Sequence, residues 1–130
     1  MASAADLSGR VAACRALREH LFWEAARTLA PAVGDAAPGR GRARLAALTE
    51  AGALVEAVLA LIGTATPGRS VRGMRFSAGR WTCTVDRATG ARFSATHADL
   101  AAALLAAFIR SCAAVRRRRV ARPHQPELRT

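Results

Sequence analysis

The residues of this sequence whose type and spacing most clearly indicate a function are arginines near its C-terminus. Arg116 to Arg119 form an unbroken run, flanked by Arg110 and Arg122. Residues 110–130 hold seven arginines and one glutamate, whereas the rest of the chain holds thirteen arginines and eight acids. A charge density of this kind binds polyanions by releasing their counterions, without reading a base sequence. We therefore predict an anion-binding segment made of Arg110, Arg116, Arg117, Arg118, Arg119 and Arg122.

Three other interpretations of the same arginine run stay open. The guanidinium groups could dock on anionic lipid, at about 1 kcal/mol for each arginine near the surface. In a eukaryotic host the run could act as a nuclear import signal. It could also be only a solvated helix end, where positive charge suits the helix dipole.

A second group of arginines falls on segments that we expect to be strands and turns. If several of these side chains share the open face of a sheet, they form a basic surface beside the C-terminal segment. The members of this possible secondary surface are Arg69, Arg72, Arg75, Arg80 and Arg92.

Patterns that would indicate catalysis or a cofactor are weak. The segment Gly63 to Ser70 approaches a phosphate-binding loop, but it has arginine in place of lysine and follows a predicted helix instead of a strand. Cys83 and His97 could form a nucleophile pair, although no neighbouring residue marks either as activated. We expect no catalytic site, no metal site, no cofactor and no small-molecule substrate.

The whole chain is short, strongly basic and rich in alanine. Its 130 residues fit one domain with a single modest core. The formal net charge is +11, which favours anionic partners. The three cysteines have no metal-ligand spacing and suit a reducing compartment. With no signal peptide and no apolar run of about 18 residues, we expect an intracellular protein, cytoplasmic or, in a eukaryote, nuclear.

Apolar residues at steps of three and four predict two helices in the first half of the chain. The first spans residues 4–30 and ends before Pro31, because the residue before a proline disfavours the α region. A linker rich in proline and glycine covers residues 31–41. The second helix spans residues 42–62, with Gly63 as its C-cap.

The second half of the chain predicts a three-stranded antiparallel meander and a last helix. The strands cover about 71–77, 80–86 and 91–95, with Trp81, Cys83 and Val85 on one face of the sheet. The helix covers 96–115, and Thr96 with Asp99 resembles a capping box at its start. This helix is apolar almost all round, so it belongs at the centre of the fold or in an oligomer interface.

The fold class is therefore α+β: a single small domain over residues 1–115, with the last helix packed on the sheet. Residues 116–130 are predicted to be a disordered Arg-rich tail. The order from 42 to 115 resembles the α-β-β-β-α layout of double-stranded RNA-binding domains. That family places a basic cluster at the start of its last helix. The matching positions here include His97 and the acidic Asp99, so the resemblance is one of order only.

The preferred interpretation is a non-enzymatic basic accessory protein that binds an anionic partner through its arginine-rich tail. Nucleic acid is the partner that we favour. One alternative is a protein-interaction or structural module that self-associates through Ala/Leu helix faces as a homo-oligomer. Another is a peripheral protein that binds an anionic membrane surface.

Overall fold

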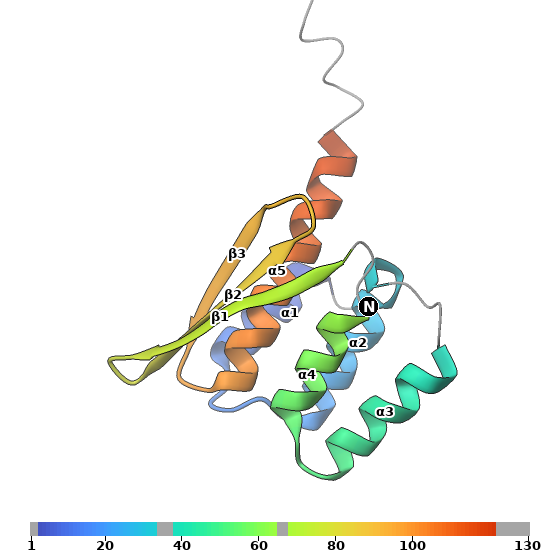
Figure 1. The fold of residues 1–130 in the computed structure, drawn as a ribbon, viewed down its shortest axis with the longest axis vertical. Helices are drawn as coiled ribbons and strands as arrows, with labels where there is room; N and C mark the ends of the chain where they lie inside the picture. The colour runs from blue at the N-terminus through green and yellow to red at the C-terminus, as the bar shows by residue number, and fades with distance from the viewer. Residues whose placement is uncertain (1–2, 34–37, 65–67, 122–130) are drawn as a thin grey trace, which may run out of the picture.

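A computed structural model describes the backbone of residues 3–33, 38–64 and 68–121, and the side chains of residues 3–29, 42–64 and 68–113. Over these residues the fold is α+β, with N-terminal helices, one antiparallel sheet and a C-terminal helix packed on it (Figure 1). The elements run in the order α1 (Ala4–Ala13), α2 (Glu19–Val33), α3 (Pro38–Glu50), α4 (Leu54–Gly63), β1 (Arg69–Ser77), β2 (Arg80–Arg87), β3 (Arg92–His97) and α5 (Leu100–Ala121).

Helix α5 lies at the centre of the fold, as its composition predicts. Every side chain from Ala101 to Ile109 is at most 9% exposed. A helix without a polar face can be buried only if neighbours enclose it on all sides. Strands β2 and β3 pack against one side of α5, and α1, α2 and α4 pack against the others.

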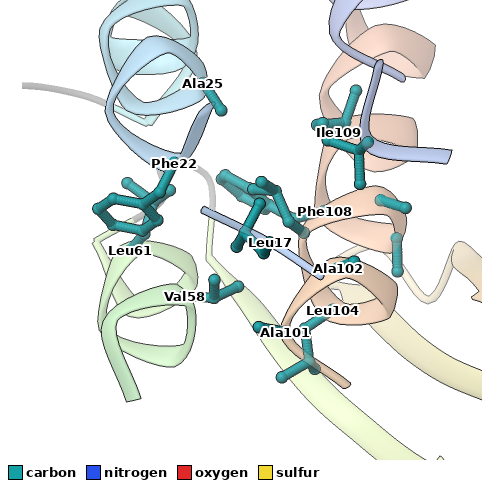
Figure 2. Close-up of a cluster of buried hydrophobic side chains, with 14 of the residues drawn as sticks. Leu17, Phe22, Ala25, Val58, Leu61, Ala101, Ala102, Leu104, Phe108 and Ile109 are labelled. Atoms are coloured by element: carbon teal, nitrogen blue, oxygen red, sulfur yellow. The ribbon is translucent and has the colours of Figure 1, made fainter. Parts of the chain in front are cut away.

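The core between the helices is built around a few large side chains in an alanine-rich setting. In Figure 2, Phe22 from α2 lies beside Leu61 from α4, and Phe108 reaches from α5 toward them next to Leu17. Phe22 and Phe108 are fully buried. The many alanines of α5 allow neighbouring elements to approach closely, and the two rings pack among these small side chains.

The prediction of one helix over 4–30 is wrong, because the chain breaks between α1 and α2. Asp99 accepts a hydrogen bond from the Leu17 N–H at 3.0 Å, and a ring nitrogen of His97 lies 2.8 Å from the Cys14 carbonyl oxygen. These distant side chains hold the backbone groups that an unbroken helix would pair internally. The helix also continues past Pro31 to Val33, since the bias before proline is only a preference.

The single helix predicted over 42–62 is also two helices, α3 and α4. Gly52 adopts a φ of +76°, which ends α3. The Ala53 N–H bonds the Leu48 carbonyl at 2.9 Å and the Gly52 N–H bonds the Thr49 carbonyl at 3.1 Å, a Schellman motif. Gly63 is the last residue of α4 and is not its cap. Helix α3 begins at Pro38, so the predicted linker over 31–41 is shortened at both ends, and residues 34–37 lie outside the described part.

The three-stranded antiparallel meander is confirmed, in the order β1-β2-β3. The inward direction of Cys83 and Val85 is confirmed by their complete burial. Strand β1 contains a bulge, because Val71 pairs with Val85 while Gly73 pairs with Thr84, which leaves Arg72 as an extra residue. The bulge explains why apolar residues along β1 do not keep strict alternation.

The start of α5 differs from the predicted capping box. Thr96 belongs to β3, where its hydroxyl lies 3.0 Å from that of Thr82. Asp99 is itself the N-cap, accepting from the Ala102 N–H at 3.1 Å. The helix extends to Ala121, through the first residues of the predicted tail. The rest of the predicted disordered tail, 122–130, lies outside the described residues.

The turn between β1 and β2 is a two-residue hairpin with an unusual sequence. Ala78 and Gly79 have φ values of +53° and +77°, as a type I′ turn requires. Glycine adopts this conformation freely, whereas alanine pays roughly 1 kcal/mol or more because its Cβ crowds the carbonyl oxygen. The twist of a type I′ turn matches that of the two strands, which explains why the strain is tolerated.

The Asp99 carboxylate joins the α5 cap to the break between α1 and α2. We predict that Asp99→Ala lowers the free energy of unfolding by about 2–3 kcal/mol, because a cap and a second partly buried hydrogen bond are both lost. Asp99→Asn keeps an acceptor oxygen and should cost less than half as much. Urea denaturation of both variants checks this, and equal losses would contradict the double role of Asp99.

Relieving the strain at Ala78 should stabilise the protein. We predict that Ala78→Asn raises the free energy of unfolding by about 1 kcal/mol, because asparagine tolerates a left-handed conformation. Ala88→Asn, in the turn between β2 and β3, is the control, since Ala88 has no positive φ. Thermal unfolding of the two variants compares them, and a gain at position 88 alone would overturn the explanation.

Candidate polyanion-binding surface

One face of the sheet is not covered by any of the described helices. The described helices pack on the side that carries Cys83, Val85 and Ala95, all of which are buried (Figure 1). Cross-strand partners in an antiparallel sheet point to the same side. The register pairs Arg75 with Thr82, and Thr82 in turn with Thr96, so these side chains share the opposite, open face.

Four arginines line this open face. Arg80 pairs with Ser77 and lies in register with the outward residues of β2. Arg92 of β3 pairs with Asp86 of β2, and Arg72, the bulge residue of β1, also hydrogen-bonds Asp86. We call this set the basic sheet face; it consists of Arg72, Arg75, Arg80 and Arg92.

The only acid of the basic sheet face among the described residues is Asp86. An Asp86 oxygen lies 3.2 Å from Arg72, and its other oxygen lies 3.6 Å from Arg92. Both arginine side chains stay more than half exposed, at 54% and 58%. Asp86 is the less exposed partner, at 19%, but solvent still screens pairs whose arginines are exposed, so most of the positive charge stays available to a ligand. Four arginines against one aspartate leave the face with a net charge of +3.

Hydroxyl groups fill the space between the arginines. The hydroxyls of Thr82 and Thr96 lie 3.0 Å apart, and those of Thr84 and Ser94 lie 2.9 Å apart. Hydroxyl and guanidinium groups are among the side-chain groups that contact phosphate oxygens. The basic sheet face therefore offers both positive charge and hydrogen-bond donors.

Arg69, predicted as part of the secondary basic surface, belongs instead to the interior. Its side chain is on the helix side of β1 and is only 9% exposed. Arg69 Nε donates to the Ser111 hydroxyl at 2.8 Å, and the guanidinium carbon lies 5.7 Å from the centre of the Phe108 ring. Burial lowers the pKa of this guanidinium, and Arg87 adds to the shift. Arg69 also occupies the lysine position of the near-match to a phosphate-binding loop, but there it begins β1 and its side chain bonds α5.

The predicted C-terminal anion-binding segment is only partly described. Arg110 is exposed on α5 and donates to the backbone carbonyl of Ser94, at the border of the basic sheet face. Arg116, Arg117, Arg118 and Arg119 lie in the last turns of α5, which run past the sheet in Figure 1. Their side chains lie outside the described residues, as does the whole of Arg122.

A further basic cluster gathers where α1 and α2 break, and the sequence analysis missed it. A hollow of about 510 Å³ is lined there by Arg10, Arg15, Arg18 and His20, together with Cys14. Arg10 is paired with Glu24. In a continuous helix Arg15 and His20, five residues apart, would point to nearly opposite sides, so the break allows both to line this hollow.

Cys83 and His97, which we considered as a nucleophile pair but did not predict, do not hydrogen-bond each other. Burial raises the pKa of the Cys83 thiol to about 11, which disfavours the nucleophilic thiolate. His97 uses both ring nitrogens, since Nδ1 accepts from the Asp99 N–H at 2.8 Å and Nε2 meets the Cys14 carbonyl oxygen. Burial, and then Asp99, also raise the pKa of the Cys14 thiol. The raised pKa values disfavour the thiolate at Cys83 and at Cys14, and His97 hydrogen-bonds the backbone on either side of it.

Two further observations concern the part of the chain that the structure describes. No group of three or more His, Cys, Asp or Glu side chains is placed to hold a metal ion there. Within the same residues, no helix combines the length and the hydropathy needed to cross a membrane.

The chain was also compared with known proteins. No family model matches it, and neither a curated protein nor a solved structure matches at a significant level.

Proposed function

We propose that this chain is a non-enzymatic basic accessory protein that binds nucleic acid through the basic sheet face and the arginines of α5. The observation that carries the proposal is the strand register, which collects Arg72, Arg75, Arg80 and Arg92 on a face that no described helix covers. A face with a net charge of +3 attracts the phosphate backbone over several ångströms.

The arrangement favours contacts to phosphates over contacts to bases. Trp81 and Phe76 pair with each other on the helix side of the sheet, and Phe93 shares that side with Val85. Among the described residues, the open face therefore offers no aromatic ring on which a base could stack. Guanidinium and hydroxyl groups bind phosphate oxygens whatever the base, so we infer binding that depends little on sequence.

Self-association through apolar helix faces is the weaker alternative. The apolar side chains of α1 and α2, such as Leu7, Val11 and Leu21, are already buried inside the chain. The nearly continuous apolar surface of α5 is enclosed by the sheet and by three helices. These faces hold the fold together, and a second copy would have to displace that packing to use them.

The test compares two double variants of equal charge. Arg75→Gln with Arg80→Gln removes two arginines of the basic sheet face, while Arg27→Gln with Arg44→Gln removes two exposed arginines from α2 and α3. We predict that the first pair lowers duplex affinity by tens of fold at about 0.1 M salt and makes the salt dependence shallower by about 2, because each phosphate contact contributes roughly 0.9 to that slope. Fluorescence anisotropy with a labelled duplex measures both quantities.

A third variant measures how much of the duplex affinity comes from the C-terminal arginines. It carries the four changes Arg116→Gln, Arg117→Gln, Arg118→Gln and Arg119→Gln. The proposal predicts loss of affinity in this variant and in the sheet variant, with the α2/α3 control close to the original protein. If the sheet variant and the control bind equally, the basic sheet face is not the contact surface. Binding to anionic vesicles without binding to either DNA or RNA would favour the membrane interpretation instead.

A further inference from the structure

Strand β1 has one edge with which no described strand pairs, although α4 contacts the strand. It is the first strand in the order β1-β2-β3 and pairs only with β2. No other described backbone group hydrogen-bonds to β1 between Ser70 and Ser77. An open row of N–H and C=O groups is a template for another strand, and natural proteins usually protect it.

The hairpin geometry identifies which backbone groups face outward. In a two-residue hairpin the pair that closes the turn, here Ser77 with Arg80, is the hydrogen-bonded kind. Along the two strands, hydrogen-bonded pairs alternate with non-hydrogen-bonded pairs. Phe76 and Met74 therefore belong to non-hydrogen-bonded pairs, and their backbone N–H and C=O groups point away from β2. These two residues supply the free backbone groups of the edge.

The same two residues carry the exposed large hydrophobic side chains among the described residues. Met74 is 47% exposed and Phe76 is 56% exposed. The Phe76 ring packs against Trp81, with ring centres 5.0 Å apart. The two side chains lie on the helix side of the sheet, but the hairpin reaches beyond the helices that cover the rest of that side (Figure 1).

The opposite side of this edge is cationic. Arg72 and Arg75 lie on the basic sheet face, and residues 70–85 contain no acid. An incoming strand alternates its side chains between the two faces of a sheet. A strand that complements β1 therefore places apolar side chains beside Met74 and Phe76, and carboxylates beside Arg72 and Arg75.

We propose that the β1 edge binds an extended segment of another protein in which acidic and apolar residues alternate. Backbone hydrogen bonds and alternate pockets of this kind are a known mode of peptide recognition. The inference does not depend on nucleic-acid binding. It predicts, however, that such a segment competes with nucleic acid for Arg72 and Arg75.

Charge and shape favour this occupant over two others. A second copy would join two basic sheet faces of net charge +3 into one sheet, and like charges that meet across strands destabilise the pairing. A bilayer would first meet the turn, where Ser77, Ala78 and Arg80 carry no large apolar group, while Met74 and Phe76 face sideways. Neither a second copy nor a bilayer would contact both the apolar side chains on one side of the β1 edge and the arginines on the other.

The probe is a synthetic peptide of about nine residues that alternates Glu with Val or Phe, a length typical of a β-strand. A peptide of the same composition, with its acids and apolar residues in separate blocks, is the control. We expect the alternating peptide to bind the full-length chain and to slow hydrogen exchange at the Met74 and Phe76 amides. The block peptide should leave both amides unprotected.

Two matched variants locate the site. Phe76→Thr keeps β propensity but removes the ring, and should weaken the alternating peptide about tenfold while leaving duplex DNA binding unchanged. Phe93→Thr is the control, because it removes a phenylalanine ring from β3, the other edge strand. It should change the affinity for the alternating peptide by no more than about twofold.

Several results would overturn the proposal. Peptide binding without protection of Met74 and Phe76 would mean charge attraction alone. Equal weakening by the two threonine variants would mean a general loss of stability. Dimers in sedimentation that Phe76→Thr abolishes would assign the edge to a second copy. A blue shift of tryptophan fluorescence on anionic vesicles, lost in Phe76→Thr and without peptide binding, would assign it to a membrane.

Discussion

The rest of the structure depends on the burial of α5 against one face of the sheet. The helix has no polar stripe over Ala101–Ile109, so it can be accommodated only where the sheet and the other helices enclose it. That requirement decides which side of the sheet faces inward. Cys83, Val85 and Ala95 point at α5, and the alternation of each strand then turns the arginines and hydroxyls outward. The basic sheet face is thus a consequence of core packing, and its arginines lie outside the core.

Arginine serves two different purposes in this small protein. Arg69 is buried, bonds the Ser111 hydroxyl and lies over the Phe108 ring, so it links the first residue of β1 to the middle of α5. The arginines of the basic sheet face keep most of their side chains in solvent, and the pairs with Asp86 neutralise only part of their charge. The same residue type is therefore structural or available for binding according to which side of the sheet it occupies.

The α+β class, the antiparallel meander and the central last helix could be predicted from the sequence, because period-two and period-four patterns report burial directly. The breaks in the two N-terminal helices could not. One depends on His97 and Asp99, which are more than eighty residues distant from Cys14 and Leu17. The other depends on Gly52, whose only sequence signal was a cost to helix propensity. For the candidate site, the arginine-rich strands were visible, but the direction of Arg69 and the bulge at Arg72 required the register.

The central claim is that the arginines of the open sheet face meet the phosphates of nucleic acid, while the buried arginine does not. Side-chain Nε–H resonances of individual arginines, followed by NMR during titration with a short duplex, test it most directly. The account predicts that the Nε–H signals of Arg75, Arg80 and Arg92 shift and exchange more slowly with water. The Arg69 signal should not change. Shifts confined to Arg27 and Arg44, with none on the open sheet face, would contradict it.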